Sequence, residues 1–230
     1  GVRSVAVLPS GGTEGAELEA LLAAEHVTYR AVRVTGSIRV NISLTEPDGT
    51  ATKINALGPT LSDEESDRLL SAVVDASGDA VLVLVSGSLP RGVGETFYAR
   101  LGEAARQCGA RFALDSSGGP LLAGLRARPD VIKPNAEELA QAVGRPLATF
   151  GDTVAAARDL GELGAATVVV SMGSDGALLV DEDGVLHAEA FVASPRSTVG
   201  AGDALLAGYL AGTLMADGER AAALREAVAW

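Results

Sequence analysis

The amino-acid sequence predicts an α/β fold with a mainly parallel central sheet and helices on both of its faces. Short apolar runs rich in β-branched residues alternate with segments of helical period rich in Ala, Leu and Glu. Such runs are typical of buried strands, and helical connections between them predict that the strands pair in parallel. The chain has 230 residues, 47% of them hydrophobic, with a mean hydropathy of +0.26. It can therefore bury a substantial core.

Most of the predicted strands end in polar residues. Helical segments such as 94–108 and 152–163 separate the strands, so parallel pairing would bring their carboxyl ends to one edge of the sheet. Ligands bind at that edge in open α/β sheets. The five strands are "SVAVL" (4–8), "AVLVLVS" (80–86), "RFALD" (111–115), "DVIKP" (130–134) and "TVVVS" (167–171).

Residues 29–55 interrupt this alternation. Polar and apolar residues alternate there, with turn signals at Thr35-Gly36 and Pro47-Asp48-Gly49 and no helical period. This pattern predicts antiparallel strands in a small sheet outside the main layer. The small sheet could extend the edge of the main sheet or cover the ligand-binding edge as a lid. The placement of Arg39 and Asn41 two residues apart, on one face, favours the lid.

Charge and composition disfavour several classes of function. The 18 Lys+Arg and 30 Asp+Glu give a net charge of −12, and only 3% of residues are aromatic, which argues against nucleic-acid binding. No apolar stretch of 18 or more uncharged residues and no export signal is recognisable, so we expect no membrane partner and a cytoplasmic location. The single cysteine, Cys108, excludes an intramolecular disulfide and fits a reducing compartment. We expect it to be a small buried residue.

The stretch "STVGAGDALLAGYLAG" (197–212) combines a glycine-rich turn with one acid, Asp203, and then an apolar helix. A turn with little side-chain bulk lets a ligand approach the backbone, and the first N–H groups of the helix are unpaired donors. A carboxylate in the first helical turn can accept a proton from an incoming hydroxyl. A first-turn acid beside glycines that allow close packing is the structural alternative.

These residues resemble the C-terminal signature of the PfkB, or ribokinase-like, family of sugar kinases. Further segments agree with the family in order and spacing, and together they resemble its phosphofructokinase branch, which includes 1-phosphofructokinase and tagatose-6-phosphate kinase. The resemblance implies a ribokinase-like fold with a small β lid. The segments are "VSGSLPRGV" (85–93), "LDSSGGPL" (114–121), "VIKPNAEEL" (131–139), "VVVSMGSDGALLV" (168–180) and "GSIRVNISLTEPDGTATKINALGP" (36–59).

The resemblance implies a catalytic group in the glycine-rich turn. Asp203 corresponds to the base that deprotonates the acceptor hydroxyl. Gly200, Ala201 and Gly202 correspond to the amides that stabilise charge on the transferring phosphoryl group.

The nucleotide side, with ATP and Mg²⁺, is implied in the same way. Asn135 and Glu138 match the family's Asn-x-x-Glu element near the magnesium and phosphates, where they act largely through water, and Lys133 would lie near the nucleotide phosphates. A solvated first-turn acid and a surface lysine are the alternatives. The turn against the nucleotide corresponds to Ser171, Gly173 and Gly176, which could also form a plain glycine turn between strands.

On the sugar side, Arg39 and Asn41 match the substrate contacts of the family's lid. Arg39 suits a sugar phosphate because a guanidinium binds phosphate bidentately, although a surface arginine on a flap is the alternative. Ser88 resembles a contact to the substrate phosphate, and the turn that Pro90 helps to fix could equally be structural.

The two ends of the sequence depart from the family pattern. The opening "GVRSVAVLPSGG" resembles the part of the family's chain that comes after its sugar-binding Asp and Gly-rich segment. The closing "EAVAW" falls inside a helix that continues in the family. We therefore expect the N- and C-terminal family segments to be absent, residues 1–28 and 60–230 to form the kinase domain, and residues 29–59 to form the lid.

The resulting hypothesis is ATP-dependent phosphorylation of a phosphorylated ketohexose, with fructose 1-phosphate going to fructose 1,6-bisphosphate. Alternatives are another sugar or nucleoside kinase of the family, such as a tagatose-6-phosphate kinase or 6-phosphofructokinase, and an inactive nucleotide-binding paralogue. The apolar positions of the lid segment also suggest a homodimer through this region. They are Val32, Val34, Ile38, Val40, Ile42 and Leu44.

Overall fold

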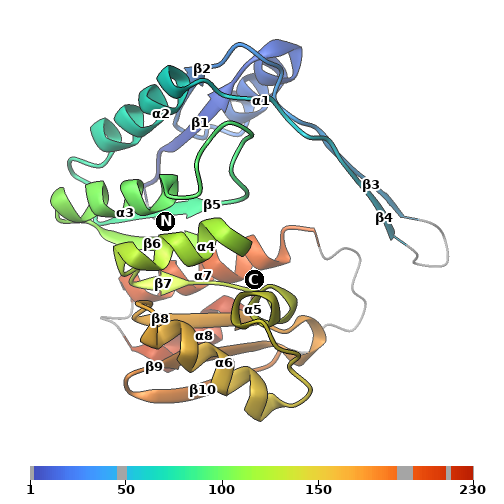
Figure 1. The fold of residues 1–230 in the computed structure, drawn as a ribbon, viewed down its shortest axis with the longest axis vertical. Helices are drawn as coiled ribbons and strands as arrows, with labels where there is room; N and C mark the ends of the chain where they lie inside the picture. Colours follow the sequence, from blue (N-terminus) through green and yellow to red (C-terminus); the bar gives the residue numbers. More distant parts are fainter. Residues whose placement is uncertain (1–2, 46–50, 191–198, 216–218, 230) are drawn as a thin grey trace. The chain divides into compact units, whose positions relative to one another are not determined.

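The chain divides into two compact units, residues 1–80 with 89–95 and residues 81–88 with 96–230. The computed structural model (Figure 1) describes residues 3–45, 51–190, 199–215 and 219–229. None of the helices in these described ranges is long and apolar enough to cross a membrane.

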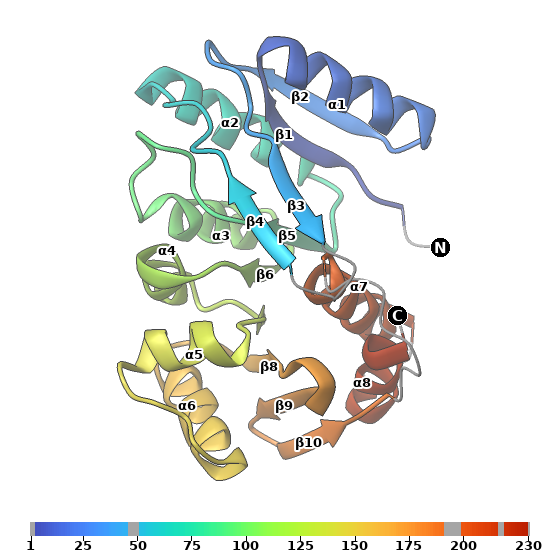
Figure 2. The same cartoon turned by 90° about the vertical axis from the view of Figure 1, so that its right-hand side faces the viewer.

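The first unit contains a parallel strand pair, β1 (Ala6–Ser10) and β2 (Tyr29–Arg33). Helix α1 (Gly12–Ala24) connects the two strands, and α2 (Asp63–Ala76) packs on the other face of the pair (Figure 2). A capping box starts α2, since Ser62 accepts from the Glu65 N–H and the Glu65 carboxylate accepts from the Ser62 N–H.

An antiparallel hairpin comes next in the same unit, made of β3 (Asn41–Thr45) and β4 (Ala51–Asn55). The prediction of antiparallel strands in residues 29–55 is therefore confirmed for β3 and β4. It is wrong for β2, which pairs in parallel with β1 because α1 returns the chain in the βαβ manner. The predicted first strand accordingly joins β2 in a two-stranded sheet and does not pair with the other four predicted strands.

The second unit is built on a six-stranded sheet with the order β10-β9-β8-β7-β6-β5. The pairs from β5 to β8 are parallel, and β9 and β10 add antiparallel pairs at one side. The expected mainly parallel central sheet is confirmed, and its four parallel strands are those predicted from the apolar runs. The strands are β5 (Leu82–Ser86), β6 (Arg111–Asp115), β7 (Val131–Ile132), β8 (Thr167–Ser171), β9 (Ala177–Asp181) and β10 (Gly184–Ala188).

Helices cover both faces of this sheet, as Figure 2 shows. One face carries α3 (Phe97–Gln107), α4 (Gly118–Gly124), α5 (Ala136–Val143) and α6 (Phe150–Glu162), with a short 3-10 turn, η1 (Leu125–Ala127), after α4. The other face carries α7 (Ala201–Met215) and α8 (Arg220–Ala229).

Small residues let these layers approach closely. A Cβ on Gly212 of α7 would lie 2.7 Å from the Cα of Ala223 in α8, and a Cβ on Gly102 of α3 would lie 2.5 Å from the Phe112 ring. Val169 and Leu179, both fully buried, lie in the core formed with α7 and α8. This packing fixes the helices against the sheet and so fixes the loops at its carboxyl edge.

Candidate active site

Polar side chains gather at the carboxyl ends of the parallel strands in the second unit. Ser86 ends β5, Asp115 ends β6, Lys133 follows β7 and Ser171 ends β8. Because these four strands are parallel neighbours, the residues lie at one edge of the sheet.

A buried lysine is the centre of this edge. The Lys133 Nζ lies 3.3 Å from the Asp115 Oδ1, with the two side chains 6% and 14% exposed. Burial raises the pKa of the Asp115 carboxyl, the charge and hydrogen bond of Lys133 oppose that shift, and the charges of Asp203 and Glu138 add to it. The charges of Asp203 and Glu138, from two other segments, therefore act on the carboxyl group that pairs with the buried lysine.

The glycine-rich turn and the start of α7 approach the same lysine. A Cβ on Gly202 would lie 3.1 Å from the Lys133 Nζ, so a side chain at this position would press on the buried ammonium group. Gly200 has a φ of +78°, and its carbonyl accepts from the Ala204 N–H at 2.8 Å. Asp203 lies in the first turn of α7 and is exposed. The structure thus brings an accessible carboxylate and a glycine backbone to the Asp115–Lys133 pair.

Asn135 and Glu138 form a capping box at the start of α5. The Asn135 Oδ1 accepts from the Glu138 N–H at 2.8 Å, and the Glu138 Oε2 accepts from the Asn135 N–H at 2.8 Å. A bridge between Asn135 and Ser171 joins this box to the end of β8. The Asn-x-x-Glu spacing therefore has a folding role, which the alternative of a solvated first-turn acid did not include.

Ser171, Gly173 and Gly176 lie in the connection from β8 to β9. A single 3-10 turn, η2 (Gly173–Asp175), makes this connection. Its first residue, Gly173, has a φ of +61°, and Gly176, which follows it, has a φ of +79°. A Cβ on Gly176 would lie 2.1 Å from the Ala188 carbonyl oxygen. The segment is thus a glycine turn between antiparallel strands, and it stands at the carboxyl edge beside Asn135.

The sugar-side candidates belong to different units. Arg39 and Asn41 are in the first unit and Ser88 is in the second. Asn41 pairs with Asn55 in the hairpin, and a Cβ on Gly58 would contact the Arg39 side chain at 3.4 Å. Ser88 comes after Gly87, whose φ is +100° and whose carbonyl accepts from Tyr98 and Ser116.

Asp115 is a residue that the sequence reasoning did not select. It lies inside the segment "LDSSGGPL" and ends a buried strand, which was the available signal. Its significance depends on Lys133, which is distant in sequence and becomes its neighbour only through parallel pairing of β6 and β7.

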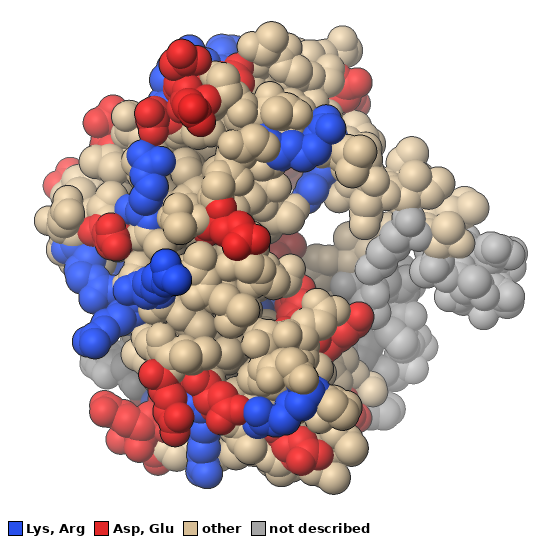
Figure 3. Space-filling model, in the orientation of Figure 1, with Lys and Arg blue, Asp and Glu red and all other residues tan. Residues whose placement is uncertain are grey.

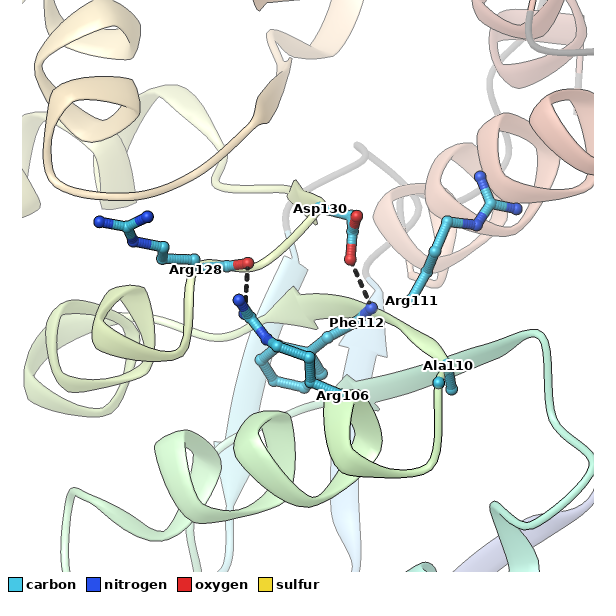
Figure 4. Close-up of a pocket in the computed structure, with 7 residues that line it drawn as sticks. Arg106, Ala110, Arg111, Phe112, Arg128 and Asp130 are labelled. Atoms are coloured by element: carbon cyan, nitrogen blue, oxygen red, sulfur yellow. Dashed lines mark hydrogen bonds between the residues drawn. The ribbon is translucent and has the colours of Figure 1, made fainter.

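A pocket of about 230 Å³ lies at the other end of these strands (Figure 4). Three arginines and one aspartate line it, and two of these charged side chains hydrogen-bond to the backbone. The Arg106 guanidinium donates to the Arg128 carbonyl at 2.9 Å, and the Asp130 carboxylate accepts from the Phe112 N–H at 2.7 Å. In Figure 4 the Arg111 and Arg128 guanidinium groups point away from each other. The pocket is therefore separate from the candidate active site and has no convergent charge.

Surface charge gives no sign of a polyanion-binding face in the view of Figure 3. Acidic and basic side chains are interspersed within each unit there, and no continuous basic surface is visible on the described residues of either unit. Within the described part of the chain, no three His, Cys, Asp or Glu side chains are grouped to hold a metal ion.

Comparison with known proteins identifies the family. The family model described as "pfkB family carbohydrate kinase" matches residues 1–230. The chain belongs to the pfkB family. The 1-phosphofructokinase of Haemophilus influenzae is 36% identical over 203 residues, and that of Bacillus subtilis 35% over 202 residues, each match covering 88% of this chain. The matches cover 65% and 66% of those relatives, so the chain spans slightly less than two thirds of their length.

Solved structures give the same fold for this pfkB family chain. Phosphofructokinase-2 from Escherichia coli in complex with potassium is 32% identical, with a TM-score of 0.90 over 98% of this chain and 73% of that one. Arabidopsis thaliana ribokinase, at 21% identity and a TM-score of 0.75, covers 98% of this chain and 73% of that chain and supports the fold alone. The expected ribokinase-like fold is confirmed.

Proposed function

We propose that this chain carries the nucleotide and catalytic side of an ATP-dependent kinase for a phosphorylated ketohexose, with fructose 1-phosphate going to fructose 1,6-bisphosphate. The observation that carries the proposal is the exposed Asp203 beside a glycine backbone and the buried Asp115–Lys133 pair. The 1-phosphofructokinase relatives favour this substrate. Phosphofructokinase-2 from Escherichia coli has been solved in complex with fructose-6-phosphate, which makes that sugar the first alternative.

In the proposed mechanism, Asp203 accepts the proton of the acceptor hydroxyl. The hydroxyl oxygen then forms a bond to the γ-phosphorus while the bond to the bridging oxygen of ADP breaks. Backbone N–H groups of Gly200, Ala201 and Gly202 donate to the phosphoryl oxygens, where negative charge is greatest in the transition state. Positioning and electrostatics supply most of the catalysis in this class of reaction.

Magnesium fits the residues on this edge. Mg²⁺ keeps several waters and takes one or two carboxylates together with substrate phosphates, so a protein cluster of three acids is unnecessary. Asn135 and Glu138 would hold the ion largely through water, with the Asp115 carboxylate as a further candidate. When bound, the ion neutralises phosphate charge. Lys133, Ser171, Gly173 and Gly176 would contact the nucleotide.

The sugar phosphate is assigned to Arg39, with Asn41 and Ser88 as further contacts. Charge-assisted hydrogen bonds contribute roughly 1.5 to 3 kcal/mol, so Arg39→Ala should raise KM for the phosphorylated sugar by about ten- to a hundredfold and leave KM for ATP nearly unchanged. Arg30→Ala, on exposed β2 surface of the same unit, is the matched control. Equal effects of Arg39→Ala on both substrates would instead indicate a role in folding the hairpin.

A coupled ADP-release assay tests the proposed function directly. It compares fructose 1-phosphate, fructose 6-phosphate, tagatose 6-phosphate and ribose, on this chain and on any longer native form. Turnover highest with fructose 1-phosphate is the expected result. Nucleotide binding without turnover in both forms would select the inactive paralogue, and turnover with ribose alone would overturn the assignment of Arg39.

A homodimer through the hairpin is part of the proposal. Ile42 faces Ile54 across the hairpin, and Leu44 lies on the same face; these side chains and Val40 are more than half exposed. Val32, also a candidate for this apolar face, is instead buried in β2.

The absence of a membrane-spanning helix among the described residues, with the single cysteine, supports a cytoplasmic location.

Sedimentation at micromolar concentration tests the dimer. Ile42→Lys should shift the protein toward monomer, because it places a charge in the apolar face. Ser43→Lys changes the opposite face of the same strand and should leave the mass unchanged. A monomeric wild-type protein would contradict the proposal.

A further inference from the structure

A histidine outside the candidate site contacts the turn between β8 and β9. The His187 Nε2 lies 2.7 Å from the carbonyl oxygen of Asp175. Since a carbonyl only accepts, the ring donates its Nε2–H in this bond. His187 is on β10, so a side chain from a neighbouring strand holds the last residue of η2.

The imidazole ring itself packs against an aromatic side chain. The Phe150 ring, at the start of α6, meets it edge to face with centroids 5.2 Å apart. The Glu189 Oε1 lies 3.6 Å from the Nδ1, beyond hydrogen-bond distance, and the His187 side chain is 31% exposed. The Phe150 contact favours one ring orientation, the one that aims the Nε2 at the turn.

The turn needs such a restraint because its own backbone is permissive. Gly173, Ser174 and Asp175 are exposed, and Gly173 and Gly176 adopt positive φ. Local bonds from the Met172 N–H to the Gly176 carbonyl at 2.9 Å and from the Gly176 N–H to the Gly173 carbonyl at 3.2 Å close the turn. The peptide linking Asp175 and Gly176 is planar, so fixing its carbonyl also fixes the direction of the Gly176 N–H.

We propose that His187 is a positioning residue for nucleotide binding, acting by holding the Asp175–Gly176 peptide plane before the nucleotide arrives. The inference rests on the proposed function, in which Gly173 and Gly176 meet the nucleotide. A pre-formed turn has less conformational entropy to lose on binding, so its restraint appears in affinity. One hydrogen bond between neutral groups corresponds to about a two- to tenfold change in an equilibrium constant.

Two substitutions separate the hydrogen bond from simple packing. The amide nitrogen of Gln can occupy the place of the His Nε2, whereas the amide of Asn is too short to reach it. His187→Asn should therefore weaken ATP and ADP binding by about two- to tenfold in calorimetry, and His187→Gln should stay within twofold of wild type. In the kinase assay His187→Asn should raise KM for ATP, with kcat and KM for the sugar nearly unchanged.

Hydrogen exchange tests the same idea without nucleotide. Amides in residues 172–176 should exchange faster in His187→Asn than in wild type or His187→Gln, while β8 and β9 keep their protection. Nucleotide binding and exchange that are alike in all three proteins would overturn the role of His187 alone. If neither the wild-type chain nor its longer form binds nucleotide, the proposed function is overturned. The restraint on the turn is judged separately: it is rejected if exchange in residues 172–176 is unchanged in His187→Asn.

Discussion

Carboxylates in the two units have opposite electrostatic surroundings. In the first unit, the buried Glu65 accepts from the Ser62 N–H, the Thr35 hydroxyl and the Thr35 N–H, which lower its pKa. In the second unit, burial raises the pKa of Asp115 in spite of its contact with Lys133, and the charges of Asp203 and Glu138 add to that rise.

This difference distinguishes carboxyl groups whose charged form is favoured by the fold from carboxyl groups whose charged form is disfavoured by their surroundings. Hydrogen bonds to Glu65 favour its charged form, so its ionisation supports the local structure. Desolvation and two nearby like charges raise the pKa of Asp115 and so disfavour its charged form. Perturbed carboxyl groups of the second kind cluster at functional sites, and this favours the carboxyl edge of the six-stranded sheet as the active site.

The largest expected effect concerns Asp203. Removal of a positioned general base typically costs about 10² to 10⁴ in rate, so Asp203→Asn should lower turnover by that factor and keep nucleotide affinity within several-fold. Asp152→Asn is the matched control, because Asp152 serves the capping box of α6 with Thr149. Steady-state kinetics in the shortest active form of the protein check both. Similar turnover of Asp203→Asn and wild type would remove Asp203 as the base.

Much of the second unit could be predicted from sequence because the apolar runs of β5, β6, β7 and β8 carry their own burial signal. The partner of β1 could not be predicted, because "SVAVL" has the same pattern as those runs and pairing depends on tertiary contacts. The glycine-rich turn itself indicated Asp203, and the resemblance to a family added Glu138 and the role of Asp203 as the base. It did not supply the Asp115–Lys133 pair or the His187 contact, which depend on which strands become neighbours.

The second largest expected effect is a difference in how much the ion pairs of the two units contribute to the free energy of unfolding. Lys133→Met leaves Asp115 as a buried charge without its partner and should lower the free energy of unfolding by about 3 kcal/mol. Adding Asp115→Asn should recover part of that loss. Arg33→Met is the control in the first unit: Arg33 pairs with Glu19 but is 71% exposed, so its loss should cost less than about 1 kcal/mol. Urea unfolding measures all four proteins, and a larger cost at Arg33 would reverse the comparison.

The smallest expected effect is the pH dependence of stability, which should have opposite signs at Glu65 and Asp115. The folded pKa of Glu65 lies below its ordinary value of 4.5, so its contribution is complete above that pH and is lost as the pH falls through the folded pKa. The stability advantage of wild type over Glu65→Gln should therefore shrink on acidification.

The folded pKa of Asp115 lies above its ordinary value of 3.8, so ionisation penalises the folded state at neutral pH. Asp115→Asn should accordingly be most favourable relative to wild type near pH 7, and this difference should decline as the pH falls through the folded pKa toward 3.8. Urea midpoints between neutral and acidic pH measure both slopes, and slopes of the same sign would show that the two acids do not differ in kind.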